Sequence, residues 1–199
     1  MKPYSAEVHQ LSDELAVCQT FDAKMKADLF ASLVQTSAGS FLIDPFAVDD
    51  ETISEFTHGR VIAGIIVTNE NHVRASDYFS RSFSAPVYAH ADAAVPGSRD
   101  IFALSDDLQI VQIAGAAKGE VALFLRMDGG TVVIGDALIN FGSHGFSLLP
   151  SKYCADIKLM RQSLTQLVEL RFERLLFAHG APILSGARDR LAALLETET

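Results

Sequence analysis

Apolar residues in the first third of the chain follow patterns that are typical of short β-strands. Residues 14–21 and 28–36 alternate apolar and polar positions in a strand-like manner. Residues 41–43 predict a buried strand that ends at Asp44, directly before a proline. Residues 60–68 form a continuous apolar run, as expected for a strand that is buried on both faces. The N-terminal part is therefore predicted to be rich in β-structure.

Helical patterns interrupt these strands and dominate the end of the chain. Residues 49–59 predict a short helix whose acidic first turn suits the helix dipole. Residues 71–83 also predict a helix, with apolar residues on one stripe. Residues 151–170 predict a long helix capped by Ser151, and residues 186–196 predict a closing amphipathic helix.

Two further strand regions end in polar side chains. Residues 120–139 predict a hairpin around Asp128–Gly130, because glycine supplies the positive φ that such a turn needs. Its second strand ends at Asp136, and the strand over residues 174–183 breaks after His179. Four predicted strands thus end in polar residues, namely Asp44, the cluster that begins at Asn69, Asp136 and His179. Strand ends that share one sheet edge line one cleft.

Composition narrows the class of protein. The 199 residues are 49% apolar, which supports a sizeable core, and we expect a single domain over residues 1–199. The net charge of -9 argues against nucleic acid or an anionic membrane as the main partner. Cys18 and Cys154 lack the spacing of a disulfide framework or a thiolate metal site. Because no secretory signal or membrane-spanning run is visible, a cytoplasmic protein is expected.

Five segments in register resemble the metallo-β-lactamase superfamily over nearly the whole chain. "FLIDP" is similar to an early family strand, "IIVTNENHVR" lies where the family has Thr-His-x-His-x-Asp-His, and "VQIAGAAKGEVALFL" lies where it has Pro-Gly-His-Thr-x-Gly-Ser between two strands. "VVIGDAL" and "LLFAHGAPI" are similar to the last two elements. The resemblance implies an α/β fold (α+β), a four-layer αββα sandwich, with a metal site at one sheet edge.

Most ligands that the resemblance implies are replaced in this chain. The family's metal-binding positions carry, in order, Asn69, Asn71, Val73, Arg74, Ala116, Asp136 and His179. Only Asp136 and His179 keep the family's residue type. His72 falls on a spacer position of the motif and is expected to point away from the site.

Arg74 is the replacement that argues most strongly against metal. A guanidinium stays protonated, and a unit charge pair about 4 Å apart interacts by about 4 kcal/mol at an effective dielectric near 20. The interaction of Arg74 with a dication would be repulsive and about twice as large. Amide oxygens, as in Asn69 and Asn71, are also weak zinc ligands. We therefore predict no metal, and we expect Arg74 to lie in the cavity and pair with Asp136.

The predicted site has catalytic candidates and cleft-lining candidates. Asp136 and His179 form either an acid–base pair or inherited architecture held by hydrogen bonds. Asn69 and Asn71 serve either as strand-end caps or as ligand contacts, and Asp44 is expected to satisfy backbone donors. The expected cleft-lining residues are Asn69, Asn71, His72, Arg74, Asp44, Ala116 and Lys118.

Three functions remain open at the level of sequence. The first is a metal-free member of the fold with a binding or regulatory role and a small-molecule ligand. The alternative is a hydrolase of esters, thioesters or amides that uses an atypical single-metal site, with zinc or iron, or no metal, around Asp136, His179 and His72. The third is a structural role as a homo-oligomer.

Overall fold

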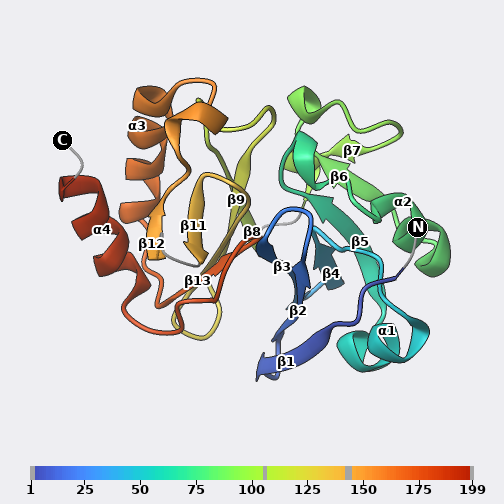
Figure 1. Cartoon of the computed structure of the whole chain (residues 1–199). Coiled ribbons are helices and arrows are strands. Elements are labelled where there is room, and N and C mark those ends of the chain that lie inside the picture. The colour runs from blue at the N-terminus through green and yellow to red at the C-terminus, as the bar shows by residue number, and fades with distance from the viewer. Residues whose placement is uncertain (1–2, 105–106, 142–144, 198–199) are drawn as a thin grey trace.

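Two β-sheets form the centre of the molecule, and helices lie on both outer sides (Figure 1). The structure is a computed structural model, and it describes residues 3–104, 107–141 and 145–197. In Figure 1, α1 and α2 lie at one side, α3 and α4 at the other, and the sheets lie between them.

The first sheet has seven strands in the order β1-β2-β3-β4-β5-β6-β7. The strands β1 to β4 run antiparallel to their neighbours, whereas β4 to β7 run parallel. The bounds are β1 Glu7–Ser12, β2 Leu15–Asp22, β3 Ala27–Thr36, β4 Gly39–Ile43, β5 Ile62–Val67, β6 Val87–Ala89 and β7 Arg99–Asp100.

The second sheet has four strands in the order β13-β10-β9-β8, and β11 and β12 form a separate hairpin. The strand β10 runs parallel to β13 and antiparallel to β9. The bounds are β8 Leu108–Gln112, β9 Val121–Leu125, β10 Thr131–Ile134, β11 Leu138–Phe141, β12 Gly145–Leu148 and β13 Arg174–Phe177. The turn between β9 and β10 has positive φ at Asp128, Gly129 and Gly130, which confirms the predicted hairpin.

Three buried apolar clusters correspond to the interfaces between the layers. The inner cluster joins the two sheets and includes Val34 and Ile66 from the first and Leu123 from the second. A second cluster packs α1 and α2 on the first sheet, and a third packs α3 and α4 on the second. Burying each large side chain contributes about 1.5–3 kcal/mol. The layer order is therefore αββα, as predicted.

Helix lengths differ from the predictions at two places. The bounds are α1 Asp50–Thr57, α2 Ser76–Phe83, α3 Ile157–Val168 and α4 Ala187–Thr197. The helix predicted over residues 71–83 is shorter because Glu70–His72 forms a separate 3₁₀ turn. The helix predicted to begin at Ser151 begins at Ile157, because Asp156 caps it by accepting from the backbone N–H groups of Lys158 and Leu159.

The carboxyl ends of the parallel strands place the polar residues of the site. The strands β4 and β5 are neighbours in one sheet, and β10 and β13 are neighbours in the other. Backbone hydrogen bonds join the sheets there, from Val121 N to Thr68 O at 2.9 Å and from Phe30 N to Ala178 O at 3.0 Å. The four polar strand ends therefore lie at one common edge, as predicted.

The helices give no indication of a membrane span. Within the described ranges, no helix is long and apolar enough to cross a bilayer.

Candidate functional site

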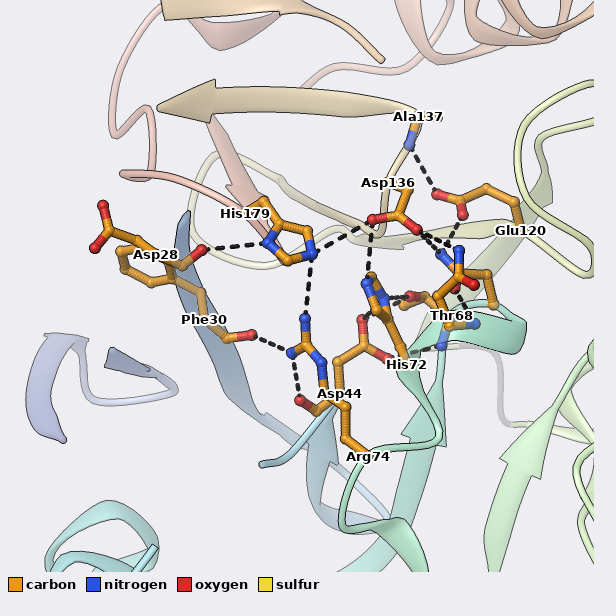
Figure 2. A network of polar contacts seen from close by, with 12 residues as sticks. Asp28, Phe30, Asp44, Thr68, His72, Arg74, Glu120, Asp136, Ala137 and His179 are labelled. Atoms are coloured by element: carbon orange, nitrogen blue, oxygen red, sulfur yellow. Dashed lines mark hydrogen bonds and ion pairs between the residues drawn. The ribbon is translucent and has the colours of Figure 1, made fainter. Parts of the chain in front are cut away.

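Polar side chains from four strand ends converge between the two sheets (Figure 2). Asp44 follows β4, Thr68 follows β5, Asp136 follows β10, and His179 follows β13. All four are buried, with exposed fractions of 0–8%. Because buried polar groups need partners, each side chain in this cluster constrains its neighbours.

His72 lies in the middle of this cluster, so the prediction that it points away from the site is wrong. Its Nδ1 lies 2.9 Å from Asp44 Oδ2, and its Nε2 lies 3.2 Å from Asp136 Oδ1. The prediction rested on the spacer position that His72 occupies in the family motif. The chain instead leaves β5 at Val67 and turns through Glu70–His72, which swings the imidazole inward.

Arg74 points into the cavity, but it does not pair with Asp136 as predicted. Its Nη1 donates to the backbone oxygens of Phe30 and Asp44 at 3.0 and 2.9 Å. Its Nη2 lies 3.4 Å from His179 Nε2 (Figure 2). Within the described part of the chain, the ion-pair partners of Asp136 are His72 and His179 instead.

The two oxygens of Asp136 face two different environments. Oδ1 lies 3.2 Å from His72 Nε2 and 3.5 Å from His179 Nε2. Oδ2 accepts hydrogen bonds from the amide groups of Asn69 and Asn71 at 3.2 and 3.0 Å. Asn69 also caps the 3₁₀ turn by accepting from Asn71 N, so the capping and contact roles are combined in one residue.

Glu120 belongs to the site, although its position in the sequence gave no sign of it. Its carboxylate accepts from Asn69 Nδ2 and from Ala137 N, and only 1% of the residue is exposed. A Cβ at Gly135 would lie 2.5 Å from Thr68 Oγ1 and 2.8 Å from Glu120 Oε1. Only glycine lets these polar groups approach so closely. In the sequence, only the glycine at position 135 points to this close packing around Glu120, and its role can be recognised only once the fold is known.

Backbone conformations at the site are unusual for residues with side chains. Asp44 has φ 50° and Arg74 has φ 38°, which is the left-handed region. Such conformations carry a cost of about 1–3 kcal/mol and cluster at functional sites. Here they turn the chain sharply after β4 and before α2.

Charges in the cluster move the pKa values of the two histidines in opposite directions. Burial disfavours charge on His72, but the carboxylates of Asp136 and Asp44 outweigh it and raise the pKa of His72 to about 9. Burial, together with the nearby charges of His72 and Arg74, lowers the pKa of His179 to about 4. Burial opposes ionisation of Asp136, but the charge of His72 holds its pKa below the usual value.

Glu120 shifts in the direction expected of a buried acid. Burial, and then the neighbouring charge of Asp136, raise its pKa to about 8. A carboxyl group with this pKa keeps its proton at neutral pH in the metal-free protein. Glu120 and Asp136 therefore lie close together with only one of them ionised.

A cleft of about 680 Å³ opens onto this cluster. Its floor includes Asn71, His72, Arg74, Asp136 and His179. The other four expected lining residues lie elsewhere. Asp44 and Asn69 are buried behind the floor, Ala116 packs in the core beneath α3, and Lys118 is exposed with its Nζ 3.9 Å from Glu70. Asp44 does bind a backbone donor, Thr68 N, at 2.8 Å.

The floor contains one set of side chains that fits a metal ion. Ligating atoms of His72, Asp136 and His179 all lie within 4.8 Å of one another. Metal–ligand bonds of about 2.0–2.1 Å in tetrahedral geometry require ligand atoms about 3.3 Å apart, close to the 3.2 and 3.5 Å separations at Asp136 Oδ1. The Nε2 atom of His72 is buried, and its contact with Asp136 Oδ1 at 3.2 Å lacks the geometry of a hydrogen bond.

Both histidines are also oriented in the manner of metal ligands. His72 Nδ1 lies 2.9 Å from Asp44 Oδ2, and His179 Nδ1 lies 3.3 Å from Asp28 O. A carboxylate or carbonyl acceptor at Nδ1 fixes the ring and leaves Nε2 for a metal. The residues present therefore fit one metal ion, whereas the amide side formed by Asn69 and Asn71 does not fit a second.

Solved structures with the same fold confirm the architecture. The metallo-β-lactamase DIM-1, solved after exposure to ceftazidime, superposes with TM-score 0.73 at 12% identity, with 100% of both chains covered. A metallo-β-lactamase from Pontibacter korlensis gives 0.74 at 13% identity, covering 97% of this chain and 100% of that one. FIM-1 from Pseudomonas aeruginosa, in its mono-zinc form, gives 0.69 at 16% identity, covering 100% and 98%.

Comparisons at the level of sequence give no match. No protein-family model matches the chain, and no curated protein matches it. The structural likeness establishes that the chain has the metallo-β-lactamase fold, which confirms the predicted architecture.

Proposed function

We propose that the protein is a hydrolase of esters, thioesters or amides that works with one metal ion held by His72, Asp136 and His179. The observation that carries this proposal is the convergence of three ligating atoms at the floor of a cleft. The fold supports it, because solved structures named as metallo-β-lactamases share the architecture. The proposal takes up the alternative that the sequence left open, a single-metal site around Asp136, His179 and His72, in place of the expected metal-free protein.

The residues around the floor have distinct roles in this proposal. When bound, a zinc or iron(II) ion would supply Lewis-acid polarisation of a carbonyl group. Asp44 and the Asp28 carbonyl orient the two imidazoles through Nδ1, and Asn69 and Asn71 hold Asp136 through Oδ2. Arg74 places a fixed positive charge beside the floor, where it stabilises negative charge that develops on a substrate oxygen.

A second candidate is the metal-free binding role, and one contact favours it. Arg74 Nη2 lies 3.4 Å from His179 Nε2, so a guanidinium N–H and a metal ion compete for the same lone pair. In this candidate the degenerate site is closed to metal, and the cations at the floor bind an anionic ligand without chemistry.

An activity panel separates the two candidates. Protein loaded with zinc or with iron(II) is assayed on matched ester, thioester and amide substrates, next to Asp136→Asn and a surface control, Asp77→Asn. Asp77 is exposed and pairs with Arg81 in α2. Metal-dependent turnover that Asp136→Asn abolishes and Asp77→Asn preserves is expected. Absence of turnover with either metal on all three bond types overturns the hydrolase in favour of the binding role.

A further inference from the structure

Two exposed lysines line the cleft and mark its solvent-facing mouth. Lys26 lies in the turn between β2 and β3, and Lys152 lies in the 3₁₀ turn Ser151–Tyr153 that follows β12. Both are exposed, and neither forms an ion pair within the described part of the chain. Lys152 Nζ lies 4.5 Å from the centroid of the Tyr153 ring.

The acidic groups that line the cleft are already engaged and do not neutralise these lysines. Asp22 accepts from Tyr4 Oη at 2.5 Å and from the backbone N–H groups of Lys24 and Met25 at 2.8 Å. Asp136 is engaged by the histidines and asparagines at the floor. In a chain with a net charge of -9, a cleft mouth with two unpaired cations runs against the overall sign.

Hydrogen bonds at Asp22 also hold the Lys26 side of the mouth in place. The turn between β2 and β3 closes on the Asp22 carboxylate, and Tyr4 ties that carboxylate to the N-terminal segment. Tyr4 N in turn donates to Ala47 O at 2.8 Å. Lys26 thus lies in a turn that is already fixed, so binding of a ligand needs to order little additional backbone there.

Apolar side chains also line the walls of the cleft. Met25, Leu29 and Phe46 come from the segments around β2 to β4, and Ile139, Leu149 and Tyr153 come from the segments between β11 and the 3₁₀ turn Ser151–Tyr153. A cleft of about 680 Å³ lies in the range of small-molecule sites, about 300–1,000 Å³. The lining of the cleft therefore combines exposed lysines, apolar side chains and a polar floor.

We propose that the substrate is an amphipathic anion, with an apolar chain along the walls and an anionic group held between Lys26 and Lys152. This names the substrate class of the proposed hydrolase and rests on that function. The scissile bond lies at the floor, and a carboxylate or phosphate group lies at the mouth. Exposed cations in a partly apolar rim attract such a group, and added salt screens the attraction.

Binding of a matched ligand pair tests the assignment without any catalysis. Octanesulfonate carries an anionic group that is a poor metal ligand, and octyl glucoside is its neutral counterpart. Titration calorimetry compares the wild type with Lys26→Met, Lys152→Met, the double variant and Lys118→Met. Lys118 is the control because it is exposed but lies outside the cleft. Methionine at position 26 has the same Cβ as lysine, so the positive φ of 54° adds no difference in strain.

The double variant is expected to bind octanesulfonate about tenfold more weakly, and each single variant about threefold. Octyl glucoside affinity and the Lys118→Met variant are expected to match the wild type. In 0.5 M salt, where the Debye length is only about 4 Å, the difference between wild type and double variant shrinks. Unchanged octanesulfonate binding in the double variant, or an equal loss for octyl glucoside, overturns the assignment.

Hydrolysis of 4-nitrophenyl octanoate by the metal-loaded protein reports on the proposed function separately. Because this ester is neutral, its turnover does not need the lysines. Lysine-dependent octanesulfonate binding without turnover of this ester or of the thioester and amide substrates contradicts the hydrolase, whereas turnover with lysine-independent binding contradicts the substrate class.

Discussion

The two sides of Asp136 show how one carboxylate can face both an open coordination site and a closed hydrogen-bond network. On the Oδ1 side, two imidazole Nε2 atoms approach to 3.2 and 3.5 Å, and the shorter contact lacks the geometry of a hydrogen bond. On the Oδ2 side, the amides of Asn69 and Asn71 donate hydrogen bonds, and Asn69 also satisfies Glu120.

The two sides of Asp136 differ in the chemical groups that face its carboxylate oxygens. Imidazole nitrogens with an acceptor at Nδ1 are metal ligands, whereas amide N–H groups donate to a carboxylate and offer nothing to a cation. Substitutions on the histidine side should therefore change metal binding, and substitutions on the asparagine side should change the stability of the folded protein. Substitutions on each side test this contrast.

Asp136→Asn is expected to have the largest effect, since it removes the charged ligand that both sides share. Metal affinity should fall at least about a hundredfold, and metal-dependent hydrolysis with it. Competition with a chromophoric chelator measures the affinity, and Asp77→Asn serves as the matched control. An Asp136→Asn protein that binds metal like the wild type would remove Asp136 from the ligand set.

Asn69→Ala tests the asparagine side. It leaves the carboxyl groups of Glu120 and Asp136 without the amide between them, so the free energy of unfolding should fall by about 2–3 kcal/mol. Denaturant unfolding measures this, and Asn71→Ala, at an exposed position, should cost less than about 1 kcal/mol. Metal stoichiometry should stay unchanged in both variants. Loss of metal in Asn69→Ala, with stability intact, would reverse the roles of the two sides.

Arg74→Met sharpens the contrast on the histidine side. It removes the guanidinium that competes for His179 Nε2, so metal affinity should rise about tenfold. The backbone oxygens of Phe30 and Asp44 lose their donor, so affinity is measured on protein whose folded state is verified by circular dichroism. Arg74→Lys keeps the charge and should show a smaller gain. Weaker metal binding in Arg74→Met would mean that Arg74 supports the metal rather than competes with it.

Glu120→Gln should change how stability depends on pH in the chelator-treated protein. The folded pKa of Glu120 is about 8, above the usual 4.5 of a glutamate, so the folded state keeps a proton that the unfolded state has lost. Wild-type stability should therefore fall as pH rises from about 4.5 to 8 through this group. In the Gln variant the fall in stability with pH should be smaller by this contribution, because His72 and His179 titrate in both proteins. Glu55→Gln, at an exposed helix position, should keep the wild-type slope. Parallel slopes in wild type and Glu120→Gln would contradict the assignment.

Sequence reasoning found the strand ends but not the directions of all their side chains. Asp44, Asp136 and His179 were placed correctly because apolar runs define where a buried strand stops. The direction of His72 was wrong because it was taken from a spacer position of the family motif, whereas the 3₁₀ turn Glu70–His72 sets the direction of the ring. A position in a motif does not fix where a side chain points once the chain has left its strand.

Other parts of the site depend on contacts between distant segments. Glu120 reaches Asn69 across 51 positions, and Arg74 reaches the carbonyl of Phe30 across 44. Neither contact has a periodic signature in the sequence. The pairing of Arg74 with Asp136 was inferred from charge alone, but the guanidinium donates hydrogen bonds to the backbone oxygens of Phe30 and Asp44 instead.

The most direct test is the metal content of the protein after incubation with zinc or iron(II) and removal of unbound ions, in the wild type and in His72→Ala. His90→Ala is the matched control, because His90 caps the 3₁₀ turn Ala91–Ala93 away from the cleft. About one ion per chain is predicted for the wild type and for His90→Ala, with almost none for His72→Ala. No bound metal in the wild type, or equal metal in His72→Ala, would contradict the single-metal site.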